Sequence, residues 1–213
     1  MKLKFVFILL LTLGWNSISA QPKTMENRST VQVWNHLQKN DSLFYAIVNR
    51  EITEENLERI RTNPNKFIPP VLFATAQYIF QNKDKDEAVF WYYVALLRAM
   101  NDTQQNELLF DRNKHIVFIY TQIFGRSIET YTTTNIQYTE KQILAACDYV
   151  RENHGLYSSA WIYLDGAEQE KDIPDIIINS QENKKQRLLT VNKFEENLNK
   201  YLKGKLTDEF KYK

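Results

Sequence analysis

Three side chains that repeat at every fourth residue, Glu107, Asp111 and His115, form the best candidate for chemistry in this chain. On a helix this spacing places them along one face, where two or three of them can ligate one metal ion. A small metal-dependent hydrolase is a function that such a face can support. The same spacing also describes a polar stripe with hydrogen bonds between successive turns. We favour the polar stripe, because no second cluster of ligands accompanies these residues in the sequence.

Cys147 and His154 are a second pair with possible chemistry, since a Cys–His pair can form a thiolate nucleophile. Seven residues of helix separate the two by about 10 Å, which is too far for the hydrogen bond that activates the thiol. Cys147 also follows two alanines on an apolar face, where a free cysteine is usually a small hydrophobic residue. The sequence contains no Gly-x-Ser-x-Gly, Walker or dinucleotide-binding motif. We therefore predict a protein that is not an enzyme and uses no cofactor.

Arg98 stands inside the most apolar stretch of the chain, and a buried guanidinium needs a carbonyl or carboxylate partner. Its side chain can reach the end of its own helix and cap the carbonyls near Met100. Alternatively, Arg98 lines a groove for a peptide together with the neighbouring aromatic residues Trp91 and Tyr92. The first interpretation makes Arg98 structural, and the second makes it part of a binding site.

Aromatic residues make up 13% of the sequence, and most of them must form the core. Tyr157, Trp161 and Tyr163 fall instead in a segment rich in loop-forming residues. Exposed aromatic side chains often anchor a partner protein. We therefore predict Trp161 and Tyr163 as further binding residues.

These candidate residues depend on a helical hairpin predicted over residues 67–100. Pro69 and Pro70 suit the first turn of a helix, and the polar run 81–85 predicts a turn, after which Asp84 or Asp86 caps the second helix. From Ala88 this second helix is apolar on almost every face, which is typical of a helix that is covered on both sides. With about thirteen apolar-dominated residues it is too short to span a membrane, which takes roughly 20.

The sequence DEAVFWYYVAL in this hairpin resembles the second helix of a tetratricopeptide or Sel1-like repeat. Ala88, Tyr92 and Ala95 take its small, aromatic and small positions, and Ala76 takes the small position of the first helix. The resemblance covers one unit of about 34 residues, at 69–102. It implies a repeat-like helical hairpin and a function in binding another protein.

The first twenty residues have the pattern of a secretory signal peptide. Lys2 and Lys4 precede an apolar run at 5–13, and small residues ending at Ala20 suit cleavage. The alternative is an uncleaved anchor helix, although the apolar run is short for one. We expect a protein of the bacterial periplasm or the extracellular space that has no membrane span after cleavage.

Charge and cysteine content restrict the function and the fold further. Removal of residues 1–20 would leave 25 basic and 26 acidic residues, whereas a nucleic-acid surface requires a net basic face. A nucleic-acid partner is therefore not expected. Cys147 is the only cysteine, so no intramolecular disulfide can form, and the fold must depend on its hydrophobic core.

The remaining patterns predict an all-α domain of about six or seven helices at 31–204, between a disordered linker at 21–30 and a flexible tail at 205–213. The helices expected besides the hairpin are one or two over 31–48, a charged one from Thr53, 107–124 ended by Gly125, 140–153 begun by a capping box at 139–142, and 181–203. Residues 127–138 have the composition of a strand or a helix, and Ile176–Ile178 suits a helical turn or an edge strand.

Together these patterns favour an exported, non-enzymatic helical protein that acts by binding another protein. A protein that protects the cell envelope against a toxin, as an inhibitor or immunity protein, is one form of this hypothesis, since size and export both suit it. The metal-dependent hydrolase at Glu107, Asp111 and His115 is the alternative from a different class.

Overall fold

The fold is built on the hairpin of α4 (Pro69–Asn82) and α5 (Lys85–Gln104), as the apolar pattern of this stretch predicts. It is seen in a computed structural model, which describes residues 30–104, 110–163 and 184–210, with side chains at 35–104, 115–162 and 184–204. Pro69 and Pro70 occupy the first turn of α4. Asp84 caps α5, because its Oδ1 accepts the backbone N–H groups of Asp86 at 2.7 Å and Glu87 at 3.1 Å.

Helices surround this hairpin on all sides, and the described residues contain no strand, which confirms the all-α single domain. The other elements are α2 (Thr30–Val48), α3 (Glu54–Thr62), η1 (Pro64–Lys66), α6 (Phe110–Tyr120), η3 (Thr121–Gly125), α7 (Arg126–Thr134), α8 (Ile136–Glu152), η4 (Ser159–Tyr163) and α10 (Lys184–Phe210). The predicted signal peptide at 1–20, most of the linker and Ile176–Ile178 lie outside the described residues.

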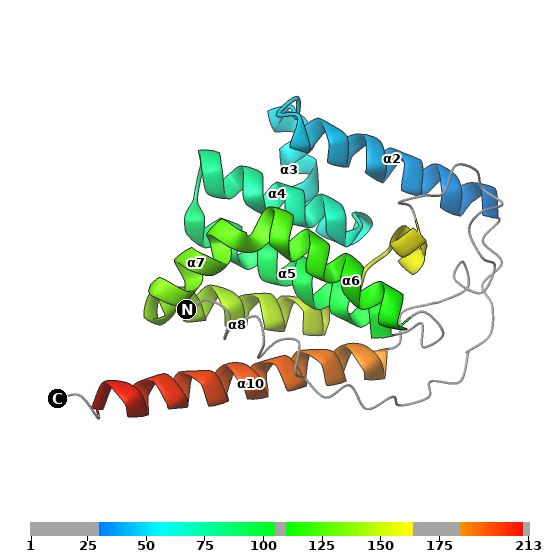
Figure 1. The fold of residues 1–213 in the computed structure, drawn as a ribbon. Coiled ribbons are helices and arrows are strands. Elements are labelled where there is room, and N and C mark those ends of the chain that lie inside the picture. The colour runs from blue at the N-terminus through cyan, green and yellow to red at the C-terminus, as the bar shows by residue number, and fades with distance from the viewer. Residues whose placement is uncertain (1–29, 105–109, 164–183, 211–213) are drawn as a thin grey trace.

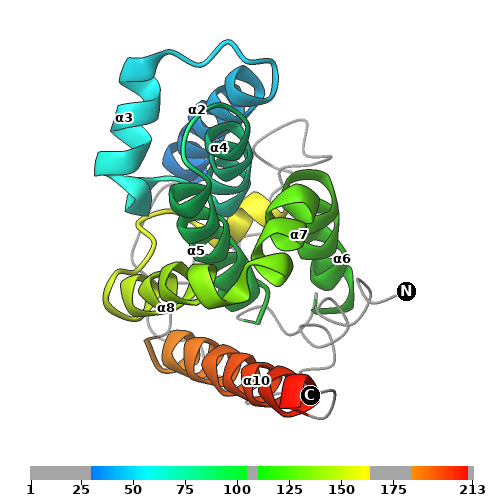
Figure 2. The ribbon, with the colours of Figure 1, turned by 90° about the vertical axis from the view of Figure 1, so that its left-hand side faces the viewer.

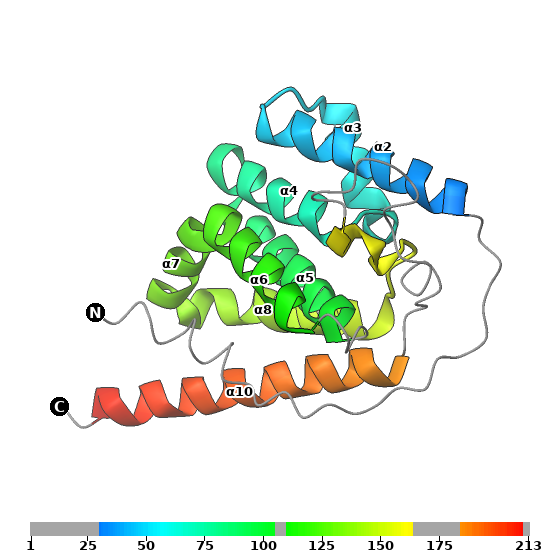
Figure 3. The same ribbon diagram turned by 45° about the vertical axis from the view of Figure 1, so that its right-hand side comes forward.

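The helices form layers around α5. Figure 1 shows α2 and α4 on one side of α5, and α8 and α10 on the other. Seen after a quarter turn, α3 and the α6–α7 pair lie on opposite sides of the hairpin (Figure 2). Helix α10 runs beneath α8 and α5, in the direction opposite to both (Figure 3). As a result α5 is buried from Ala88 to Thr103, except for Phe90, which is half-buried.

Gly125 does not end a helix, which corrects the prediction made from its residue type. A π-helical turn at Thr121–Gly125 joins α6 directly to α7, and Gly125 has right-handed helical angles of φ −94° and ψ −21°. Its lack of a side chain serves packing instead. A Cβ atom at this position would lie 2.4 Å from the hydroxyl oxygen of Tyr92, so glycine allows the helix backbone to lie against that ring.

The segment 127–138, whose composition suits a strand or a helix, is helical except at Asn135, which separates α7 from α8. Its threonines, which favour strands, satisfy their hydroxyl groups on the helix itself. The Oγ1 atoms of Thr130, Thr132 and Thr134 donate to the carbonyl oxygens of the residues four positions earlier, at 2.8–2.9 Å. Ile128 and Thr132 are both buried, and this burial on one side of the segment favours the helix α7 over a strand.

The capping box predicted at 139–142 is wrong, because α8 begins three residues earlier, at Ile136. Thr139 lies inside the helix and is fully buried, and its hydroxyl group donates to the carbonyl oxygens of Asn135 at 3.1 Å and Thr132 at 3.3 Å. The sequence motif is therefore a contact between α7 and α8. Gln142, the other end of the presumed box, points sideways from the helix and lines a surface hollow.

The last helix also differs from its predicted limits. Helix α10 runs to Phe210, so that most of the tail expected at 205–213 continues the helix. Val191 and Phe194 on its inner side are buried, as predicted, whereas Leu189 is 38% exposed. None of the described helices is both long enough and apolar enough to span a membrane.

Candidate functional site

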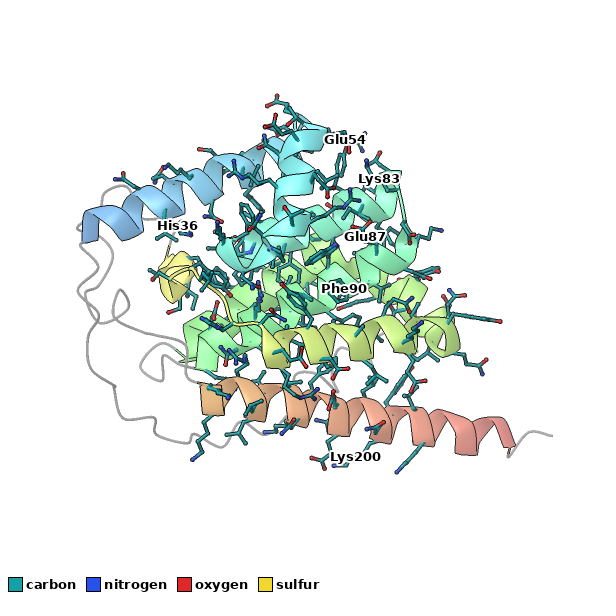
Figure 4. All side chains as sticks on the ribbon, turned by 180° about the vertical axis from the view of Figure 1, so that it is seen from behind. His36, Glu54, Lys83, Glu87, Phe90 and Lys200 are labelled. Atoms are coloured by element: carbon teal, nitrogen blue, oxygen red, sulfur yellow. The ribbon has the colours of Figure 1, made fainter. Side chains whose placement is uncertain are left out.

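A surface hollow of about 460 Å³ lies where α3, α5 and α8 meet. Figure 4 shows Glu87 and Phe90, two of its residues, on α5 near α8. The lining residues are Arg61 from α3, then Asp86, Glu87, Phe90 and Trp91 from α5, and Lys141, Gln142 and Ala145 from α8. The volume falls within the roughly 300–1,000 Å³ of ligand pockets, and we refer to this feature as the α3–α5–α8 hollow.

Parallel packing of α5 against α8 produces this hollow. Arg98 near the end of α5 meets Asn153 after the end of α8, with 3.5 Å from its Nη2 to the carbonyl oxygen. One to two turns earlier, the rings of Phe90 and Trp91 contact Tyr149, at centroid distances of 5.7 and 6.3 Å. The hollow opens beyond this contact, towards the N-terminal ends of both helices, where the small side chain of Ala145 leaves space.

A rigid ion pair forms the wall of the hollow on the α3 side. Nε and Nη2 of Arg61 donate to the two carboxylate oxygens of Glu87 at 2.7 and 2.8 Å, and this bidentate bond raises the pKa of Arg61. The indole Nε1 of Trp91 donates to the same carboxylate at 3.0 Å. Bidentate arginine–carboxylate pairs fix geometry more strongly than single contacts. The pair therefore holds the indole ring in place and adds no net charge to the site.

The floor of the hollow is aromatic. The rings of Phe90 and Trp91 lie edge to face at a centroid distance of 4.8 Å, and Tyr149 packs against both from α8. Phe90 is half-buried and Trp91 is 7% exposed, so the floor presents parts of two rings to solvent. Aromatic surface of this kind provides much of the binding energy at protein interfaces.

Polar groups without partners stand on the α8 side of the hollow. The Oε1 atom of Gln142 is buried and accepts no hydrogen bond, although buried amide oxygens are nearly always paired. Lys141 is exposed and makes no hydrogen bond or ion pair with the described residues. Asp86, at the α5 edge, accepts a hydrogen bond from the hydroxyl of Tyr131 at 3.3 Å.

Arg98 is enclosed by the domain, which overturns the prediction that it lines a peptide groove. It is 3% exposed, and its guanidinium donates to the carbonyl oxygen of Pro64 at 3.0 Å and to the side chain of Asn65. It also donates to the carbonyl oxygen of Asn153. Capping near Met100 is likewise wrong, because these acceptors belong to other segments. Arg98 joins η1 and the end of α8 to α5.

Tyr92 is also enclosed, with no exposed surface. Its hydroxyl group donates to the carboxylate of Glu129 on α7. Burial raises the pKa values of both groups, so the tyrosine stays protonated as the donor of this bond. Of the predicted binding residues whose side chains are described, Trp91 alone lines the α3–α5–α8 hollow.

Trp161 is buried as well, and it does not form an exposed anchor. It is 2% exposed, and its Nε1 donates to the carboxylate of Asp102 on α5 at 2.7 Å. The hydroxyl of Tyr157 bonds to the same carboxylate, whose burial raises the pKa of Asp102 to about 7. Together these contacts attach η4 to the core. The side chain of Tyr163 lies outside the described residues.

The candidate metal ligands are only partly described. Glu107 and the side chain of Asp111 lie outside the described residues, and His115 is exposed. In the rest of the chain that the structure describes, no three His, Cys, Asp or Glu side chains come together as metal ligands. Cys147 is fully buried, and burial raises its pKa to about 12, so its thiol remains protonated and shielded.

Sequence reasoning did not find most of the residues of the hollow. Arg61 and Glu87 are 26 positions apart, and no local pattern indicates their pairing. The pattern around Gln142 predicts a helix cap, while Lys141 and Ala145 have no distinctive context in the sequence. Comparison with protein-family models, with curated proteins and with solved structures finds no match to this chain.

Proposed function

We propose that this chain is an exported, non-enzymatic helical protein that acts by binding another protein at the α3–α5–α8 hollow. The observation that carries the proposal is the arrangement of that site. An aromatic floor, a wall fixed by the Arg61–Glu87 pair and an unpaired buried acceptor on Gln142 occur together on one surface.

Each part of this arrangement suits an interface. Protein-binding sites combine aromatic anchors in an apolar centre with a polar rim. The ion pair keeps the indole of Trp91 in one orientation, so less side-chain entropy is lost on binding. The signal-peptide pattern at 1–20 and the resemblance of the hairpin to helical repeats support the exported and protein-binding parts of the proposal.

A pull-down from envelope extract with a blocked site tests this function. The variant Ala145→Trp fills the hollow, and Ser127→Trp adds the same side chain at an exposed position of α7 outside it. We expect the wild-type protein and Ser127→Trp to retain one stoichiometric partner, and Ala145→Trp to lose it.

Circular dichroism confirms that both variants are folded before the comparison. A partner retained equally by Ala145→Trp would contradict the location of the site. No partner from the wild-type protein, even with a crosslinker, would contradict binding as the function.

A further inference from the structure

We propose that the α3–α5–α8 hollow takes an extended polypeptide segment of its partner, with an apolar side chain on the aromatic floor and an acidic residue next to it. The backbone of this segment pairs with the side-chain amide of Gln142, and its acidic residue pairs with Lys141. This inference rests on the function proposed above and specifies what the partner presents to the site.

The amide of Gln142 points to a peptide backbone. Its buried Oε1 lacks a donor, and a polar group left unpaired in this way destabilises the protein until a ligand supplies the bond. If the amide were turned over, its buried nitrogen would lack an acceptor instead. A peptide unit offers both an N–H and a C=O group, so a polypeptide backbone satisfies Gln142 in either orientation.

The floor determines the side chain next to that backbone. Phe90 and Trp91 present ring surface, and Ala145 is exposed beside them. Because alanine covers little of the floor, a side chain the size of leucine or phenylalanine can contact both rings. Burial of such a side chain is favourable in proportion to the apolar area that leaves water.

The charges at the rim determine the neighbouring residue. Arg61 and Glu87 neutralise each other in the bidentate pair. Asp86 lies at the α5 edge, where the hydroxyl of Tyr131 donates to it. Lys141 is the cation of the rim that makes no ion pair with the described residues. A carboxylate on the partner segment therefore complements the α8 side of the hollow.

Peptides selected from a random dodecapeptide library on phage are the probe for this inference. Selection on the wild-type protein with counter-selection on Ala145→Trp retains sequences that need the hollow. We expect these sequences to share an apolar residue with an acidic neighbour. A synthetic peptide of the selected sequence is then titrated into the protein. The NMR signal of the indole N–H of Trp91 reports binding at the site and gives the dissociation constant.

Matched variants test each contact in that titration. Gln142→Leu is compared with Gln137→Leu at an exposed position of α8, and Lys141→Glu is compared with Lys39→Glu on α2. We expect Gln142→Leu, and N-methylation of the peptide at its apolar residue, each to weaken binding about tenfold. Lys141→Glu should weaken binding several-fold and reduce its dependence on salt, whereas both control variants should bind as the wild type does.

The outcomes separate the inference from the proposed function. If Ala145→Trp abolishes binding of the natural partner while Gln142→Leu and Lys141→Glu leave it unchanged, the hollow is the site but its occupant is not the segment described. If the library gives no sequence that depends on the hollow, or a basic consensus, the inference is also overturned. If the natural partner binds Ala145→Trp normally, the proposed function itself fails.

Discussion

Arg98 shows how a single buried cation can hold distant parts of the chain together. Its guanidinium meets carbonyl oxygens of Pro64 and Asn153, and the side chain of Asn65 that it contacts also accepts a hydrogen bond from Tyr149 at 2.8 Å. The guanidinium carbon Cζ also lies over the ring of Tyr149, 5.6 Å from the ring centroid. A residue that is unusual in an apolar helix is therefore structural here.

Removal of this cation should destabilise the protein strongly. Arg98→Met removes the hydrogen bonds from this buried guanidinium to the carbonyl oxygens of Pro64 and Asn153 and to the side chain of Asn65, and we expect the free energy of unfolding to fall by about 3 kcal/mol. Urea denaturation measures this change. Arg126→Met, at an exposed position on α7, should change stability by less than about 0.5 kcal/mol. Equal effects of the two variants would contradict the structural role of Arg98.

Asp102 should make stability depend on pH. Burial raises its pKa from 3.8 to about 7 in the folded protein, against the opposing hydrogen bonds of Trp161 and Tyr157 and the charge of Arg98. The folded state therefore holds this proton more tightly than the unfolded state does. Its contribution to stability is fully present below pH 3.8 and is lost as the pH rises towards about 7.

The comparison with Asp102→Asn isolates this effect. We expect the free energy of unfolding of the wild type, relative to that of Asp102→Asn, to decrease between about pH 4 and pH 7 and then to level off. Denaturation at a series of pH values measures the difference. A constant difference across this range would show that Asp102 does not change its protonation on unfolding.

At the scale of helices, the contact between Gly125 and Tyr92 explains a junction that the sequence alone does not predict. Tyr92 is fully buried between its neighbours, and its ring lies directly against the backbone of the π-helical turn. Such turns in a helix mark places where local packing or function overrides the regular hydrogen-bond pattern. Here the packing of one ring determines where α6 passes into α7.

Gly125→Ala should therefore destabilise the protein, even though alanine is the better helix former. The added Cβ atom would lie 2.4 Å from the Tyr92 hydroxyl oxygen, and we expect a loss of about 2 kcal/mol through overpacking. Gly204→Ala, where no atom lies within 4 Å of the added Cβ, should instead stabilise α10 slightly. Thermal unfolding compares the two variants, and a stabilised Gly125→Ala protein would contradict this account.

The sequence predicts elements of this fold better than it predicts their ends and partners. The α4–α5 hairpin follows from local signals, namely two prolines, a capping aspartate and an apolar run. The start of α8 does not, because the hydroxyl of Thr139 bonds within and across helices rather than at a cap. The sequence predicts the hollow least well, because the ion pair in its wall joins residues 26 positions apart and its floor depends on the direction of α8 relative to α5.

At the scale of the molecule, α5 is the central helix around which the described layers pack. Helix α4 covers one side of it, α8 and α10 cover the other, and residues from α6 and α7 complete the enclosure. Phe194 of α10, which is 3% exposed, packs against Tyr93 of α5 at a centroid distance of 5.7 Å. With one shared core, the domain should unfold as one unit.

Phe194→Ala tests this cooperativity. Loss of the buried ring should lower the free energy of unfolding by about 3 kcal/mol. Leu189→Ala, at a position that is 38% exposed on the same helix, should cost less than about 1 kcal/mol. We expect circular dichroism and tryptophan fluorescence to give a single coincident transition in both variants. An early separate loss of helix in Phe194→Ala would show that α10 unfolds independently.

The central position of α5 has a consequence for biosynthesis. Part of the surface that covers α5 is synthesised late in translation. Gln104 at the end of α5 accepts a hydrogen bond from Thr190, which is 86 residues further along the chain. At about 5–20 residues per second, ribosomes take roughly 4–17 seconds to synthesise such a stretch. During that interval the most apolar helix of the protein lacks the surface of α10. A nascent chain of this kind should depend on a chaperone that shields α5 until the last helix has been made.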